Sequence, residues 1–311
     1  MYPIRFKPVY QDYVWGGDRI AAKYHRDVTV SRIAESWEIS DRDDGMSVAM
    51  NGAYRGKSLH ELMREMGENL VGVGQKFDRF PLLLKIIDAK ENLSIQVHPD
   101  EQTAPGLKGD PKTEMWFILE EGTVLAGLKK EVSEKQFLEA IKTNKAEECL
   151  EKLELKRGEA IYIPGGRVHA VCAGTLLYEV QQNSNTTYRL YDWGRTGRAL
   201  HLKEGLAAIH WSDKGHAKVT PQRLQSDLHH QIVTLVSSPF FIVERFDIFD
   251  KLHIGAIPKS FQIFFCIEGE GEISADSYKE PFQPGMTYLI PAAAKAIEIE
   301  GKCQALRVRL P

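Results

Sequence analysis

A hydroxyl, an amide and an imidazole alternate along one short segment of the sequence, as Ser94, Gln96 and His98. In an extended strand successive side chains point to opposite faces, so these three share one face, and the leucine, isoleucine and valine beside them share the other. The apolar face can pack into a core, while the polar face lines a surface or a cavity. An imidazole two residues from an oxygen donor is half of a metal site, although a single histidine in a strand more often forms only a hydrogen bond.

A second candidate ligand, His169, follows a glycine-rich turn with a specific spacing. Five residues separate Gly158 from Pro164, and the histidine comes five positions after that proline. The spacing resembles the second sequence motif of cupins, small jelly-roll barrels in which the turn directs the histidine into the barrel mouth. The other cupin motif supplies His-x-His and a downstream glutamate, so the candidate ligands here are Gln96, His98, Glu114 and His169. These donors suit Zn²⁺, and the same ligand types also bind Fe²⁺, Mn²⁺, Co²⁺ or Ni²⁺.

The composition of the 311 residues is that of a globular protein. Hydrophobic residues make up 43% and charged residues 27%, with both signs mixed to a net charge of −3, so we expect no nucleic-acid or membrane partner. No apolar run is long enough for a membrane span or a signal core. The four cysteines form no Cys-x-x-Cys pair, which favours reduced thiols in a cytoplasmic protein.

Short strands separated by turns dominate the sequence pattern. We expect a buried strand over residues 81–89, further strands over 93–98, 113–119 and 175–181, and only strands from 231 to the end. No glycine-rich turn joins a strand to a long helix, which argues against a dinucleotide-binding or phosphate-loop fold. The pattern predicts a mainly β protein with two cupin-type jelly-roll units and a few short inserted helices.

Two capping boxes mark helix starts. Ser58 pairs with Glu61 three residues later, and Ser133 pairs with Gln136 in the same way. The first predicts a short helix, and the second predicts a longer helical insert near 132–153, where apolar residues keep helical spacing.

The C-terminal part of the sequence repeats the second motif without its ligands. Five residues separate Gly285 from Pro291, and Ala296 takes the place of the histidine. The segment that starts at Gln262 likewise echoes the one that starts at Glu114. We interpret this as a second, metal-free cupin unit; the alternative is a coincidental similarity between strand–turn–strand segments.

These patterns suggest a division into two domains. We place a catalytic metal-binding cupin unit at residues 1–215 and a metal-free cupin-like unit at 231–311, with a polar linker over 212–230. Short strands are also expected within the first 55 residues. Because some of these can pair into the second unit, the structural boundary need not follow the sequence.

Longer blocks of the sequence resemble type I mannose-6-phosphate isomerases, in particular their short bacterial form. The blocks include Ser94–Asp100, Lys112–Trp116, Pro164–Ala170 and Gln181–Arg195. They run from about residue 8 to 210, and the C-terminal third resembles the family only in general pattern. The family often has Lys-Pro-Glu where this chain has Lys-Thr-Glu, and the large helical domain of its longer members has no room here.

The resemblance implies an enzyme that interconverts mannose 6-phosphate and fructose 6-phosphate in carbohydrate metabolism. It implies one Zn²⁺ per chain, held by the four candidate ligands named above. It also implies an active-site arginine at Arg189, a lysine near the metal at Lys112, and substrate neighbours at Ser94 and Lys85.

Such an isomerisation moves a proton between C1 and C2 of the sugar through an enediolate. A divalent ion stabilises the charge of the enediolate, and Arg189, which is permanently charged, can support the same oxyanion. Two residues compete for the role of general base: Lys112, if the metal and the arginine keep it neutral, and Glu179, in the strand after the histidine motif. For the substrate phosphate the candidate cations are Lys85 and Arg195.

Two other functions compete with the isomerase. A cupin oxygenase also holds Fe²⁺ with two histidines and a carboxylate, but the lysines and the arginine favour an anionic, phosphorylated substrate. A non-catalytic sugar-phosphate sensor would bind its ligand without turnover, and the retained Lys112 and Arg189 argue against it. The sequence leaves open whether the protein is a monomer or a homodimer.

Overall fold

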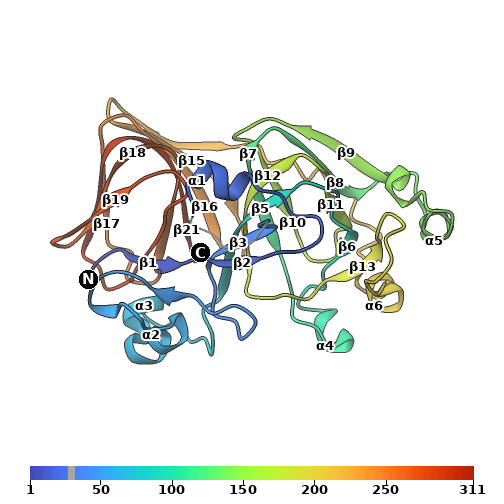
Figure 1. Cartoon of the computed structure of the whole chain (residues 1–311), viewed down its shortest axis with the longest axis horizontal. Helices are drawn as coiled ribbons and strands as arrows, with labels where there is room; N and C mark the ends of the chain where they lie inside the picture. The colour runs from blue at the N-terminus through green and yellow to red at the C-terminus, as the bar shows by residue number, and fades with distance from the viewer. Residues whose placement is uncertain (27–31) are drawn as a thin grey trace. The chain divides into compact units, whose positions relative to one another are not determined.

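The computed structural model describes residues 1–26 and 32–311 and shows a mainly β protein with short helices (Figure 1). The chain forms two compact units. The unit that contains all the candidate site residues comprises Tyr10–Ser36 and Leu84–Val219 and is called the site unit below. The other, called the C-terminal unit, comprises Met1–Val9, Trp37–Leu83 and Thr220–Pro311.

Two sheets give the site unit its jelly-roll character. One has the strand order β10-β7-β12-β5-β3-β2, and the other has the order β13-β6-β11-β8-β9. The bounds of the first sheet are β2 Val9–Gln11, β3 Glu35–Ile39, β5 Leu82–Ala89, β7 Glu114–Glu120, β10 Ala160–Ile163 and β12 Thr175–Gln182. Those of the second are β6 Ile95–Val97, β8 Gly122–Leu128, β9 Leu150–Leu155, β11 His169–Val171 and β13 Tyr188–Tyr191.

The two sheets of the site unit pack face to face. One buried cluster contains Trp116 and Leu177 from the first sheet with Val124 and Val171 from the second. A separate cluster covers the other face of the second sheet. There the apolar residues of β6 meet α5 Glu134–Lys142 and α6 Leu202–Ala208. The predicted alternation along residues 93–98 is confirmed for Ile95 and Val97, which lie in this second cluster. It is wrong for Leu93, which was expected on the same face but belongs to the cluster between the two sheets.

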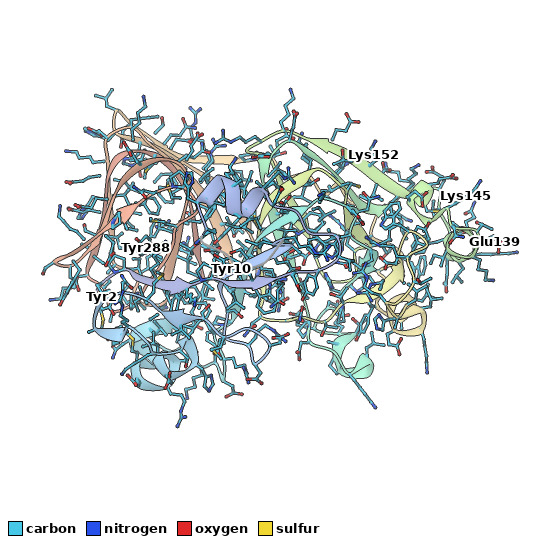
Figure 2. All side chains as sticks on the ribbon, in the orientation of Figure 1. Tyr2, Tyr10, Glu139, Lys145, Lys152 and Tyr288 are labelled. Atoms are coloured by element: carbon cyan, nitrogen blue, oxygen red, sulfur yellow. The ribbon has the colours of Figure 1, made fainter. Side chains whose placement is uncertain are left out.

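Both predicted capping boxes are present, but the second helix is shorter than expected. Ser58 caps α2 Leu59–Met66, and Ser133 caps α5. The predicted helical stretch 132–153 is wrong beyond α5, because Asn144 has a left-handed φ of 56° and β9 then pairs with β8. Figure 2 labels Glu139 on the helix and Lys152 on the strand, and both side chains are exposed.

The remaining helices are short. They are α1 Arg19–Tyr24, α3 Glu68–Val71 and α4 Ala104–Leu107, with 3-10 turns at Gly52–Tyr54 and Ala146–Cys149. In the part of the chain that the structure describes, no helix has the length and apolar character needed to cross a membrane.

A ten-stranded sheet forms the C-terminal unit. Its main order is β14-β15-β16-β21-β18-β20-β1-β4, and β17 and β19 pair with β21 and β18. The strands are β1 Ile4–Lys7, β4 Val48–Ala49, β14 Gln222–Ser226, β15 His230–Ser237, β16 Ile242–Ile248, β17 Lys251–Gly255, β18 Gln262–Ala275, β19 Tyr278–Phe282, β20 Thr287–Ile290 and β21 Ala296–Arg309. Figure 1 shows the long strands in orange and red.

The boundaries of the two units differ from those expected from sequence order. Strand β1 pairs with β20, so the first residues of the chain complete the C-terminal unit rather than the site unit. The stretch 212–230, expected to be a linker, contains β14, which pairs with β15. Every residue of β14 is exposed, which explains why its sequence lacks the apolar signal of a strand.

The internal repeat is confirmed in the backbone geometry. Gly158 and Gly285 have left-handed φ angles of 85° and 81°, which side chains other than glycine rarely tolerate. Glu114 lies opposite Ile163 in one unit, and Gln262 lies opposite Ile290 in the other, each partner five residues after its glycine. The second copy thus repeats the strand pairing while Gln262 and Ala296 replace two of the candidate ligands.

Candidate metal centre and active-site cavity

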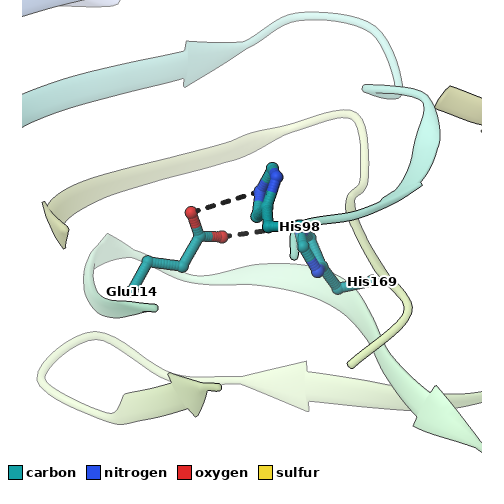
Figure 3. Close-up of side chains that lie close together, drawn as sticks. All are labelled: His98, Glu114 and His169. Carbon is teal, nitrogen blue, oxygen red and sulfur yellow. Dashed lines mark ion pairs between the residues drawn. The ribbon is translucent and has the colours of Figure 1, made fainter. Parts of the chain in front are cut away.

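The three strongest candidate ligands come together inside the site unit. His98 follows β6 directly, Glu114 begins β7 and His169 begins β11. Their ligand atoms all lie within 4.8 Å of one another, and all three residues are buried. Figure 3 shows both imidazoles next to the Glu114 carboxylate, with dashed lines that start from its two oxygens. The pairing of β11 with β6 brings these ligands together, because His169 lies opposite Gln96, two residues before His98.

Hydrogen bonds fix both imidazoles in the orientation that a metal requires. His98 Nδ1 donates to the Thr186 carbonyl oxygen at 2.8 Å, and His169 Nδ1 donates to that of Arg167 at 2.9 Å. A carbonyl oxygen can only accept, so the proton of each neutral ring lies on Nδ1. Each Nε2 therefore carries no proton and presents its lone pair as an acceptor, the atom through which such a histidine can bind a metal.

The charges and the burial of His98, Glu114 and His169 show that a cation fits between them. The Nε2 atoms of His98 and His169 lie 3.4 Å from the two oxygens of Glu114, although both partners are acceptors. Burial, with Lys112 adding to it, lowers the pKa of both imidazoles, that of His98 to about 3. Burial alone would raise the pKa of the Glu114 carboxyl, but Lys112 and His98 hold it well below its usual range. Neutral imidazoles therefore face an ionised carboxylate, and a bound divalent ion satisfies all three.

Gln96 lies beside this triad but turns its amide nitrogen toward it. Its Nε2 is 3.2 Å from His169 Nε2, and its oxygen accepts from the Ser94 hydroxyl at 3.2 Å. The amide oxygen and nitrogen exchange places when the side-chain amide rotates by half a turn. After that rotation Gln96 offers an oxygen to the same point as the triad.

A cavity of about 300 Å³ adjoins the metal centre within the site unit. Two of its wall residues connect it to the triad, because Gln96 contacts His169, and Lys112 Nζ lies 3.1 Å from Glu114. The cavity is lined by Tyr13, Trp15, Glu35, Lys85, Ile87, Leu93, Ser94, Gln96, Lys112, Glu179, Asn185, Thr187, Arg189 and Arg198. The structure thus brings the expected Lys85, Ser94, Lys112, Glu179 and Arg189 to one place.

A buried lysine between two carboxylates forms one wall of the cavity. Lys85 Nζ lies 3.2 Å from Glu35 and 3.2 Å from Glu179. Burial alone would lower the pKa of Lys85, but the two carboxylates raise it above its ordinary value. Burial, with Glu114 as the next cause, raises the pKa of Glu179. The lysine therefore stays charged, while Glu179 is easier to protonate than an exposed glutamate.

The two arginines expected at the site take different positions. Arg189 lines the cavity and donates from Nη1 to the Ala199 carbonyl oxygen at 2.8 Å. Arg195 is not among the lining residues and is held by Asp192 at 2.7 Å and by the Asn92 carbonyl oxygen. Arg198, which also pairs with Asp192, reaches the cavity instead.

The sequence analysis did not identify Glu35 or Arg198. Glu35 lies in a short aromatic segment at the start of β3, with no motif around it. Arg198 follows a glycine-rich turn after Trp193, where Arg195 is the more obvious candidate. The pairing of Asp192 with both arginines is visible only in three dimensions.

Known proteins match the chain over nearly its whole length. A model described as phosphomannose isomerase type I, catalytic domain, matches residues 4–115, and one described as mannose-6-phosphate isomerase, cupin domain, matches residues 231–310. Mannose-6-phosphate isomerase ManA of Bacillus subtilis is 33% identical, covering 98% of each chain. Mannose-6-phosphate isomerase of Streptococcus mutans is 31% identical, covering 94% of this chain and 93% of that protein.

A crystal structure gives the same result. The mannose 6-phosphate isomerase from Bacillus subtilis matches with a TM-score of 0.91 and 31% identity, covering 99% of both chains. The face-to-face sheets and the buried His–Glu–His set define a metal-binding cupin. Full-length identity above 30% makes the assignment narrower: the chain belongs to the type I phosphomannose isomerase family.

Proposed function

We propose that this protein interconverts mannose 6-phosphate and fructose 6-phosphate as a metal-dependent aldose–ketose isomerase. The observation that carries the proposal is the buried His98–Glu114–His169 triad beside a cavity that holds carboxylates, lysines and arginines. The activity named for the Bacillus subtilis and Streptococcus mutans relatives supports it. The lysines and arginines that line the cavity suit an anionic, phosphorylated sugar, which favours the isomerase over a cupin oxygenase.

The proposed cofactor is one Zn²⁺ per chain, held by the ligand set Gln96, His98, Glu114 and His169. Two imidazoles, a carboxylate and an amide oxygen are donors that zinc accepts. A bound divalent ion supplies Lewis-acid polarisation of the sugar carbonyl. The residues themselves contribute the neutral ring nitrogens and the ionised carboxylate described above.

Glu179 is our proposed general base. It lines the cavity, and burial raises the pKa of its carboxyl, which suits a group that must accept and return a proton. Lys112 lies against Glu114, and we propose that it donates hydrogen bonds to the sugar oxygens. Arg189 supports the oxyanion of the enediolate, and Ser94 contacts the sugar from the cavity wall.

For the phosphate group we propose Arg198 as the main contact. It presents a guanidinium to the cavity, whereas Arg195 does not line it. Lys85 is already shared by two carboxylates, so we assign it to the proton-transfer site rather than to the phosphate.

The general base can be tested by proton exchange. Glu179→Gln and Lys112→Met are incubated with mannose 6-phosphate in D₂O, and deuterium at C2 is followed by NMR. We expect Lys112→Met to exchange, although slowly, and Glu179→Gln to lose exchange. Exchange at the wild-type rate in Glu179→Gln would remove the base role from Glu179.

The proposed activity is tested by a coupled assay. Purified wild-type protein is given mannose 6-phosphate, fructose 6-phosphate is measured, and bound metal is determined in the same sample. We expect turnover together with a divalent metal; a metal-loaded protein without turnover would contradict the proposal. Oxygen uptake in the presence of bound iron would favour a cupin oxygenase.

Two further expectations concern the protein in the cell. The four cysteines are free thiols, which fits a reducing compartment, and we propose a cytoplasmic location. Whether the protein is a monomer or a homodimer stays open, and light scattering would decide it.

A further inference from the structure

Glu35 is a buried cavity residue to which the proposed chemistry gives no role so far. It begins β3, and only 7% of its surface is exposed. Burying a carboxylate is costly unless a cation compensates for it. The cation here is Lys85, and the same ammonium also contacts Glu179.

The three side chains form a row across neighbouring strands. Strand β5, which carries Lys85, lies between β12, which carries Glu179, and β3, which carries Glu35. Both oxygens of Glu179 are held, one by Lys85 and the other by the indole N–H of Trp116 at 2.9 Å. The base is thus fixed in place, and one ammonium is divided equally between two carboxylates at 3.2 Å each.

The sharing of the Lys85 charge between Glu35 and Glu179 affects how readily Glu179 accepts a proton. A carboxylate that has a lysine ammonium to itself is a weak base, because the ammonium stabilises its ionised form. A second carboxylate on the other side of the lysine offsets this stabilisation and adds its own negative charge. The remaining charged groups that act on Glu179 are Glu114, which opposes its ionisation, and Lys112, which favours it; Arg189 and Arg198 line the same cavity.

We infer that Glu35 is a positioning residue for the isomerisation, which holds Lys85 midway between the carboxylates so that Glu179 remains basic enough to accept a proton. This inference rests on the proposed function and on Glu179 as the base. Glu35 acts through Lys85, and its removal affects proton transfer rather than metal or substrate binding. A residue that only stabilised the fold would leave the pH profile of turnover where it is.

The test is the pH dependence of kcat in Glu35→Gln. Without the negative charge of Glu35, the Lys85 ammonium pairs with Glu179 alone. The ionised form of Glu179 is then favoured, and the pKa of Glu179 falls. We expect the acid limb of kcat to move about one pH unit lower and kcat at its optimum to fall about tenfold, because a weaker base abstracts the proton more slowly. KM for mannose 6-phosphate and the metal content should stay within about twofold of wild type. An acid limb at the wild-type pH, with or without a loss of kcat, would overturn the inference.

A second variant, Lys85→Met, should shift the acid limb of kcat in the opposite direction. In Lys85→Met the two carboxylates face each other without a cation, so we expect the acid limb to move to higher pH. An unchanged acid limb in this variant would also overturn the inference, which keeps it testable if Glu35→Gln fails to fold. Glu120→Gln is the matched control, because Glu120 pairs with Lys23 and Arg19 and does not line the cavity. It should keep the wild-type profile.

The same experiment separates the two proposals. If the wild-type protein does not isomerise mannose 6-phosphate, the proposed function itself is wrong. If the wild type is active and the acid limb of either Glu35→Gln or Lys85→Met matches it, only the role of Glu35 is wrong.

Discussion

At the scale of single residues, the main feature of the site is a group of unprotonated nitrogen and oxygen atoms that face one another. Both imidazoles donate from Nδ1 to backbone carbonyls, so their Nε2 atoms and the Glu114 oxygens face one another as acceptors. Residue type and spacing were enough to predict this set, because His98 and His169 stand in recognisable motifs. They were not enough for Glu35 and Arg198, whose partners come from distant parts of the chain.

The acid response of the metal-stripped protein follows from the buried His98. In the unfolded chain the pKa of His98 returns to about 6.5, so the unfolded state takes up a proton below that pH. The folded state takes up the same proton only near pH 3. The stability from this group is present above pH 6.5 and is lost as the pH falls toward 3. The loss is at most about 1.4 kcal/mol per pH unit for each proton.

Urea unfolding of chelator-treated protein at pH 7, 6 and 5 measures this effect. We expect the free energy of unfolding of the wild type to fall over this range, and that of His98→Gln to fall less. Equal slopes for the two proteins would show that His98 is not held neutral.

The two arginines paired with Asp192 provide a matched comparison. Arg198→Ala should raise KM for mannose 6-phosphate by tenfold or more, because it removes a charged hydrogen bond of about 1.5–3 kcal/mol to the phosphate. Arg195→Ala, which removes the same charge outside the cavity, should change KM less than threefold. Equal effects of the two substitutions on KM would remove the phosphate role from Arg198.

At the scale of elements, the glycine turn before β10 and the corner that follows it position His169. The side chain of Arg167 forms a two-pronged ion pair with Asp213, at 2.7 and 2.8 Å, and its carbonyl oxygen holds His169 Nδ1. Asp213 lies in the segment after α6, so the ion pair ties that segment to the corner. Groups that orient a metal-binding histidine in this way contribute to metal affinity.

Asp213→Asn tests this connection. The variant loses one charge of the pair, and we expect metal affinity to fall about tenfold while the protein stays folded. Competition with a chelator, followed by metal analysis, measures the affinity, and Glu120→Gln serves again as the control. A metal affinity equal to that of the wild type would show that the carbonyl of Arg167 needs no such support.

Elements were predictable where the signal is local. The capping boxes at Ser58 and Ser133 are confirmed because both partners lie within one turn. Residues 150–153 were expected to continue the helix, and they form part of β9 instead because β8 offers a partner. The exposed β14 was missed for a related reason, since a strand without a buried face has no alternating pattern to detect.

At the scale of the whole molecule, the same strand pairing occurs in two units, but among the described residues a His–Glu–His triad is found in the site unit alone. In the C-terminal unit Glu244 and Arg307 form a buried ion pair, and Arg307 also donates to Gln262 at 3.0 Å. Gln262 is the counterpart of Glu114, so this polar network includes the position that holds a ligand in the site unit. Sequence order could not show which residues complete this unit, because β1 joins it from the other end of the chain.

Glu244→Gln tests how far this network supports the C-terminal unit. Removing one partner leaves Arg307 buried with its charge uncompensated, which costs about 3–5 kcal/mol. We expect a clear loss of thermal stability while the remaining folded protein keeps its metal. A melting temperature within about one degree of wild type would show that Arg307 finds other partners.

The central claim is that the buried triad holds the one metal ion on which isomerase activity depends. The most direct test is a titration: the protein is stripped with a chelator, Zn²⁺ is added back in steps, and fructose 6-phosphate formation is measured at each step. We predict that activity rises linearly and reaches its plateau at one ion per chain, and that His169→Ala regains neither metal nor activity. Full activity in the stripped protein, or restoration of activity by Zn²⁺ in His169→Ala, would contradict the account.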